Sequence, residues 1–140
     1  MGIFYTSRAT YDTLTTMVHI SASARSYPKL PYEKMCEAVL GTHYELSLTF
    51  VGSVRARALN KAHRKATYVP NVLSFPLASH AGEIYIAPSV AVKEASKYGL
   101  SPRGYVGYLF IHGLLHLKGY PHGATMEKAE KKYSAQFSLK

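Results

Sequence analysis

The segment PRGYVGYLFIHGLLHLKG, residues 102–119, decides how this chain can fold. It is apolar on nearly every side of a helical wheel, and a helix of that kind belongs in the middle of a protein. Ser101 and Pro102 are typical of a helix start, and Gly119 is typical of a helix end. The sequence therefore predicts a long central helix that the rest of the chain covers.

Strand and helix patterns alternate along the rest of the chain. Alternating or short apolar runs predict strands at 13–20, 44–51, 69–77 and 82–87. Helical periodicity with fitting start and stop residues predicts helices at 31–41, 53–66, 88–99 and 124–137, the last of them a solvated surface helix. Pro76 places the third strand at a sheet edge. We expect an α+β fold, a single small domain in which helices cover a mixed sheet of about four strands and the central apolar helix carries the histidines.

The composition limits the class of protein. A chain of 140 residues fits one domain, taken as residues 1–140. Cys36 is the only cysteine, which excludes an intrachain disulfide and a cysteine-based zinc site and favours a reducing compartment. No apolar run is long enough for a membrane span, and the first 30 residues lack the features of a secretion signal. We therefore expect a cytoplasmic protein without a membrane partner.

Three of the seven histidines lie in or just after the central helix, at His112, His116 and His122. The first two are one helical turn apart on the same face, and Gly119 can adopt the left-handed conformation that turns the chain back toward them. Each imidazole buried without partners would cost roughly 1–3 kcal/mol, so a shared metal ion explains the group better than three separate core histidines. Zinc accepts imidazole nitrogen readily, and three protein ligands leave its fourth position open for water, as in catalytic sites.

The same histidine spacing occurs in metalloproteases of the H-E-x-x-H-x-x-G-x-x-H type. In those enzymes the glutamate after the first histidine is the general base. Gly113 occupies that position here, and a peptidase without that carboxylate would lose both water activation and proton delivery. A zinc metalloprotease-like hydrolase with an H-x3-H-x5-H site is therefore the weaker alternative.

The helix expected at 53–66 is strongly basic in a chain whose formal net charge is +9. Its positive residues are Arg55, Arg57, Lys61, Arg64 and Lys65, with Val54, Ala58 and Ala62 expected on the opposing rows. Such a face is either simply solvated or follows the phosphates of a nucleic acid. Its position directly before the predicted edge strand favours the second interpretation.

Two blocks of the sequence resemble the YbeY family of metal-dependent endoribonucleases. LNKAHRKATYVPNVLSFP, residues 59–76, resembles the family's LN-x-x-x-R…DVLSFP block, and HGLLHLKGYPH, residues 112–122, resembles its HG-x-LHL-x-GYDH block. Between them, AGEIYIAPSVAVKEA at 81–95 looks like the family's GDI-x-I strand and following helix. The likeness covers roughly residues 45–125, and two ordered blocks are far more specific than the histidine spacing alone.

The resemblance implies a zinc-dependent, single-strand-specific endoribonuclease that acts in ribosomal RNA processing and maturation, with ribosomal RNA and the ribosomal subunit as partners. It implies one zinc ion on His112, His116 and His122, and Arg64 as the catalytic residue that faces the metal across an RNA cleft. The expected RNA-binding residues are Arg57, Lys61, Arg64 and Lys65.

The chain departs from the family blocks at three positions. Pro121 stands where the family usually has Asp, Asn71 where Asp or Asn is found, and Thr67 where an acid is frequent. A carboxylate at 121 could orient the third metal ligand, and loss of such a partner typically costs roughly 10–100-fold in metal affinity or activity. Alternatively, the fixed φ of Pro121 holds the turn before His122 rigid.

Two mechanistic alternatives stay open at the level of the sequence. The nucleophile is either water or the ribose 2′-hydroxyl. No Asp or Glu near the histidines is an obvious general base, so metal-bound hydroxide serves without one or with help from His63 or His80, which are otherwise surface residues. The second alternative function is a non-catalytic RNA-binding ribosome assembly factor with a structural zinc.

Overall fold

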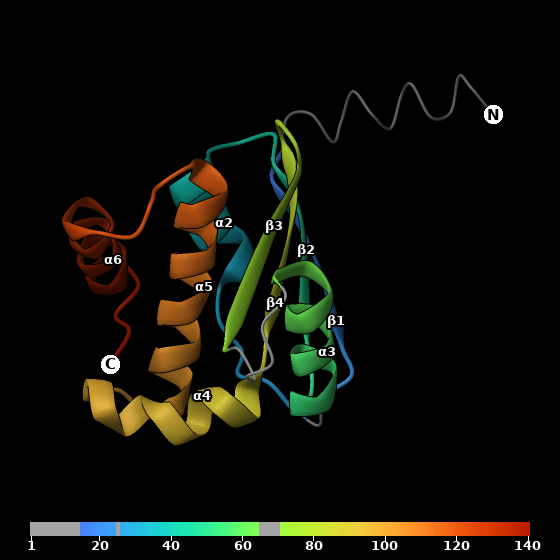
Figure 1. The fold of residues 1–140 in the computed structure, drawn as a ribbon. Helices are drawn as coiled ribbons and strands as arrows, with labels where there is room; N and C mark the ends of the chain where they lie inside the picture. The colour runs from blue at the N-terminus through green and yellow to red at the C-terminus, as the bar shows by residue number, and fades with distance from the viewer. Residues whose placement is uncertain (1–14, 25, 65–70) are drawn as a thin grey trace.

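The computed structural model describes residues 15–24, 26–64 and 71–140 and contains the expected mixture of strands and helices (Figure 1). The described strands are β1 (Met17–Ala22), β2 (Glu45–Phe50), β3 (Val72–Ala78) and β4 (Ala81–Ile86). The described helices are α2 (Tyr32–Leu40), α3 (Ser53–Arg64), α4 (Pro88–Glu94), the short 3₁₀ helix η1 (Ala95–Tyr98), α5 (Pro102–Lys118) and α6 (Ala124–Gln136). The predicted type of each of these elements is confirmed.

The described strands form one mixed sheet in the order β1-β2-β4-β3. Strand β2 pairs in parallel with β1 and β4, whereas β3 runs antiparallel to β4. Pro76 lies in β3, and the register shifts between Pro76 and Ala78. A proline is tolerated there because one side of an edge strand has no ladder partner. The predicted α+β class, the mixed sheet and the edge position of β3 are confirmed.

Helices cover both faces of the sheet, and the side chains of β4 show which helix covers which face. Ile84 and Ile86 are fully buried in the main core, which also contains residues of α2 and α5. Tyr85 points the opposite way in the strand and packs in a small cluster with Ala56 of α3. Figure 1 shows the same arrangement, with α2 and α5 on one side of the sheet and α3 on the other.

Helix α5 lies at the centre of the main core, as its apolar sequence predicts. Phe110, Ile111 and Leu114 have no exposed surface, and the helix contacts α2, α6, β3 and β4. Its first turn is capped by the Ser101 hydroxyl, which accepts a hydrogen bond of 3.0 Å from the Gly104 N–H. In the part of the chain that the structure describes, no helix has both the length and the apolar character needed to cross a membrane.

Most predicted bounds differ from the structure by a few residues, and two elements show the clearest differences. The strand expected at 13–20 is Met17–Ala22, because its ladder with β2 begins at Met17 and continues to Ala22. The helix expected at 88–99 ends at Glu94 and tightens into η1 before Gly99, whose φ of 67° ends it. Short 3₁₀ segments of this kind are common where a helix ends.

Gly113 lets α5 lie directly against β3 and β4. A Cβ atom at this position would lie 2.9 Å from the Ser74 hydroxyl oxygen and 3.1 Å from Cδ1 of Ile84. The Ser74 hydroxyl also donates a hydrogen bond of 3.1 Å to the Gly113 carbonyl oxygen. A larger residue would therefore require the side chains of Ser74 and Ile84, or the helix itself, to shift, which disfavours the glutamate of the metalloprotease pattern.

Replacing Gly113 by Glu is expected to destabilise the fold strongly. Overpacking a core typically costs about 1–3 kcal/mol, and a buried carboxylate without a partner adds to that loss. The better helix propensity of Glu returns only about 1 kcal/mol. Urea unfolding measures the free energy of unfolding, with Val54→Glu as the matched control because Val54 is 85% exposed on α3. Equal stability of the two variants would contradict the close packing at Gly113.

Candidate metal centre

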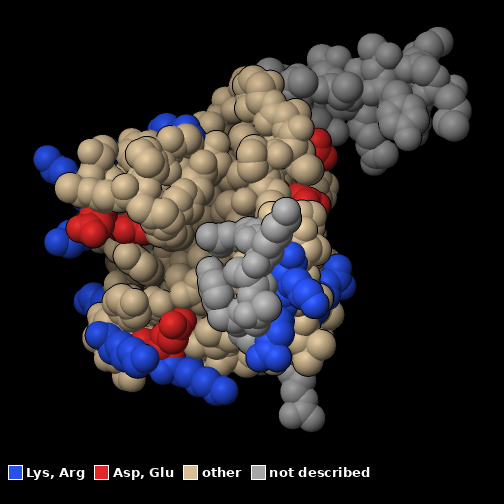
Figure 2. Space-filling model, in the orientation of Figure 1, with Lys and Arg blue, Asp and Glu red and all other residues tan. Residues whose placement is uncertain are grey.

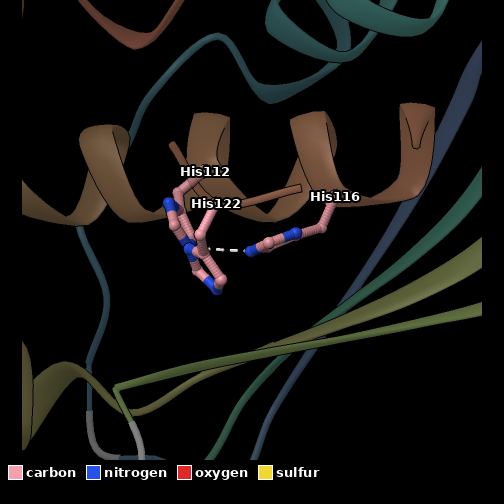
Figure 3. A group of neighbouring side chains, drawn as sticks. All are labelled: His112, His116 and His122. Carbon is pink, nitrogen blue, oxygen red and sulfur yellow. Dashed lines mark hydrogen bonds between the residues drawn. The ribbon is translucent and has the colours of Figure 1, made fainter. Parts of the chain in front are cut away.

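Three histidines converge at the C-terminal half of α5, as the sequence predicts (Figure 3). His112 and His116 lie one turn apart on the helix, and His122 returns from the segment that follows it. Each histidine offers one ring nitrogen, and these three nitrogens all lie within 4.8 Å of one another. One ion can therefore contact all three side chains.

The end of α5 produces this return of the chain. Gly119 has a φ of 106°, in the left-handed region that side chains rarely adopt. The N–H of Gly119 donates to the His116 carbonyl, and the N–H of Tyr120 donates to the Leu115 carbonyl. These bonds satisfy the last carbonyls of the helix and fix the direction in which the chain leaves it.

The spacing of the nitrogen atoms fits tetrahedral coordination. The Nε2 atoms of His112 and His116 are 3.0 Å apart. Two zinc–nitrogen bonds of about 2.0–2.1 Å at a tetrahedral angle would hold their nitrogens about 3.4 Å apart. Only a small adjustment of the two rings separates the observed arrangement from that geometry.

His116 is held in the form that a metal ligand requires. Its Nδ1 atom lies 3.1 Å from the Tyr120 carbonyl oxygen, which can only accept, so Nδ1 carries the proton and Nε2 keeps its lone pair. Burial, followed by the charges of His112 and His122, lowers the pKa of His116 below its ordinary value. Neutral imidazole is the form that binds metals.

His112 has a carboxylate partner that sequence reasoning missed. Its Nδ1 atom lies 2.5 Å from Oε2 of Glu130, which belongs to α6 and is 3% exposed. The Tyr108 hydroxyl donates a hydrogen bond of 3.1 Å to the other oxygen of Glu130. Burial, followed by the charge of Glu130, raises the pKa of Tyr108 to about 12, so this hydroxyl keeps its proton at neutral pH.

The interpretation of α6 as a solvated surface helix is therefore wrong along one face. Met126 and Glu130 are buried and lie four residues apart on that face, while Glu127 between them is exposed. A charged residue on the apolar row of an amphipathic helix was the available signal, since such a residue needs a buried partner.

An open pocket of about 610 Å³ lies over the histidines. It is lined by His63, Asn71, Val72, Leu73, Ser74, Phe75, His112, His116 and His122. The exposed His63 is the penultimate residue of α3, and its ring lies 4.7 Å from that of Phe75. Asn71 donates a hydrogen bond of 3.1 Å to Glu94 at the end of α4. His80 lies in the turn between β3 and β4 and does not line the pocket.

Helix α3 presents positive charge to solvent, and Figure 2 shows Lys and Arg side chains gathered over it. Arg55, Arg57 and Lys61 are exposed. The Arg64 side chain and the whole of Lys65 and Thr67 lie outside the described residues, although Arg64 is the last residue of the helix.

The expected apolar rows of α3 are wrong. Val54, Ala58 and Ala62 are exposed, whereas Ala56 and Asn60 are buried. The helix rests on the sheet through Ala56, which packs in the small cluster that includes Tyr85. The buried row therefore includes a polar residue, Asn60, and it cannot be recognised from the positions of the apolar side chains alone.

Comparisons with known proteins show which family this chain is similar to. A family model described as Endoribonuclease YbeY matches residues 17–138. The Endoribonuclease YbeY of Mycoplasma mycoides subsp. mycoides is 32% identical, over 65% of this chain and 68% of its own length. That of Thiobacillus denitrificans is 31% identical over 87% of this chain and 88% of its own length. The match to that of Mesoplasma florum is 37% identical and covers 57% of that relative.

A solved structure shares the fold. The solution structure of a protein from Thermotoga maritima superimposes with a TM-score of 0.65 and 25% sequence identity. The similarity covers 86% of this chain and 89% of the other. The predicted resemblance to the YbeY family is confirmed by these findings.

We expect the protein to bind one divalent metal ion per chain. The variants His112→Ala, His116→Ala and His122→Ala should each lose this ion, because the two imidazoles that remain hold a first-row ion poorly. Elemental analysis of protein purified without chelators measures the stoichiometry. His80→Ala is the matched control, since this histidine lies outside the pocket. A wild-type stoichiometry near zero, or full occupancy in all three variants, would contradict the site.

Pro121→Asp is expected to tighten metal binding by roughly 10-fold, because an added carboxylate can accept a hydrogen bond from a ligand imidazole. His122 is the ligand to benefit: among the described residues it makes ring contacts with the other two histidines and no hydrogen bond. Competition with a chelator of known affinity measures the change. Pro121→Ala removes the fixed φ of proline without adding a carboxylate, so it measures the effect of φ alone. Weaker metal binding by both variants would indicate that the rigid turn before His122 matters more than an added carboxylate.

Proposed function

The chain belongs to the YbeY endoribonuclease family, and on this basis we propose that it is a zinc-dependent, single-strand-specific endoribonuclease acting in the processing and maturation of ribosomal RNA. Residues 1–140 would form one such domain in the cytoplasm, with one zinc ion per chain. Its substrate would be ribosomal RNA, which it would bind as part of the ribosomal subunit.

One observation carries the proposal: the three histidines and the end of the basic helix α3 border the same pocket. The three imidazoles supply a ligand set that zinc accepts. His63 of α3 also lines this pocket, and Arg57 and Lys61 are exposed on the same helix. A polyanionic strand following α3 would therefore pass over the histidines.

Each group has a separate task in the proposed mechanism. His112, His116 and His122 would hold the ion. When bound, zinc supplies Lewis acidity and lowers the pKa of a coordinated water toward about 7. Arg64, the catalytic residue proposed here, would contact the scissile phosphate and balance the charge that develops on its oxygens. Arg57, Lys61, Arg64 and Lys65 would bind neighbouring phosphates of the RNA.

Two other functions have less support. A metalloprotease of the pattern considered above needs a glutamate at 113, where a Cβ atom would already contact Ser74 and Ile84. A structural zinc is usually closed by a fourth protein ligand. Among the described residues, the potential metal-binding group that includes His116 contains three histidines and lines an open pocket. This favours a catalytic site over an RNA-binding factor with a structural ion.

Arg64→Ala is expected to leave metal binding intact and to lower the rate of RNA cleavage by on the order of 100-fold or more, because a phosphate contact made in the transition state is lost. Arg64→Lys should fall between wild type and Ala, since a point charge cannot make the planar two-pronged contact of a guanidinium. Cleavage of single-stranded RNA, with and without a chelator, measures the effect. Arg103→Ala at the start of α5 is the control, and equal rates for all four proteins would place Arg64 on the solvated surface.

A further inference from the structure

Glu130 makes two contacts that an ordinary surface glutamate does not make. Its Oε2 atom is within hydrogen-bond distance of Nδ1 of His112. Its Oε1 atom accepts a hydrogen bond from the hydroxyl of Tyr108. The residue is 3% exposed, so water does not provide its hydrogen bonds. A buried carboxylate is costly unless such partners satisfy it, and both partners come from one face of α5.

The contact determines which nitrogen of His112 faces the pocket. A carboxylate accepts hydrogen bonds, so the proton of a neutral His112 belongs on Nδ1 and the lone pair on Nε2. Nε2 of His112 lies 3.0 Å from Nε2 of His116, and Tyr120 holds the proton of His116 on Nδ1 in the same way. Both helix histidines thus direct Nε2 toward the same point, one held by a carboxylate and one by a carbonyl.

We propose that Glu130 is a positioning residue of the metal centre, which fixes the tautomer and ring orientation of His112 and raises the basicity of its Nε2 atom. This inference rests on the proposed metal-dependent function. The Tyr108 hydroxyl donates a hydrogen bond to the second carboxylate oxygen, which favours the orientation in which Glu130 contacts His112. The consequence is that the docking of α6 on α5 and metal binding by His112 favour each other.

Zinc affinity of the full chain tests the proposal, measured by competition with a chromophoric chelator. Glu130→Ala should weaken zinc binding by roughly 10–100-fold, the usual effect of removing a carboxylate from a metal-bound histidine. Glu130→Gln should weaken it less, because the amide keeps the size and one acceptor oxygen but not the charge. Glu127→Gln is the matched control, since Glu127 is exposed on the same helix and should bind zinc as wild type does.

A spectroscopic measurement separates positioning from a merely structural role. In histidine side-chain ¹H–¹⁵N spectra of the zinc-loaded protein, His112 should show a protonated Nδ1 in wild type and in Glu127→Gln. The resonance of this proton should shift in Glu130→Gln, a variant that preserves shape and so keeps the test valid if Glu130→Ala fails to fold.

The outcomes distinguish this inference from the proposed function. Wild-type zinc affinity and an unchanged Nδ1–H resonance in Glu130→Gln and Glu130→Ala would overturn the role of Glu130 alone. No zinc uptake by the wild type would overturn the metal-dependent function, and this inference with it.

Discussion

The burial of α5 is the constraint on which the rest of the structure depends. This helix is apolar around most of its surface, so the sheet covers one side of it and α2 and α6 cover others. His112 and His116 interrupt the apolar surface and cannot be covered by aliphatic side chains alone, because their ring nitrogens need hydrogen-bond partners. The fold meets this requirement with Glu130, with the carbonyl of Tyr120 and with an open pocket on the remaining side.

The parts of the structure that follow from local chemistry could be predicted. Ser101 caps α5, Gly119 ends it in the left-handed conformation, and Pro76 lies on an edge strand, all as the sequence indicates. The convergence of the three histidines follows from the same facts, because a helical turn and a left-handed glycine are properties of the neighbouring chain. Each of these conclusions needed only residues close together in sequence.

The parts that depend on packing between distant segments could not be predicted. Glu130 is 18 residues from His112, and nothing in the spacing says which face of α6 will meet α5. The buried row of α3 runs through Ala56 and Asn60 and not through Val54, because Ala56 is the residue that packs in the cluster with Tyr85. In both cases the helix itself was predicted, and the face that it buries was decided by the surface that it meets.

The position of Glu130 in α6 also limits when its contact with His112 can form during synthesis. His112 and His116 leave the ribosome with α5, and His122 follows within one short turn, but the carboxylate that contacts His112 comes later and on a different helix. A nascent chain that has folded its sheet against α5 still exposes the face of α5 that α6 covers. The contact between Glu130 and His112 can therefore form only after α6, the last of the described elements in chain order, has been synthesised.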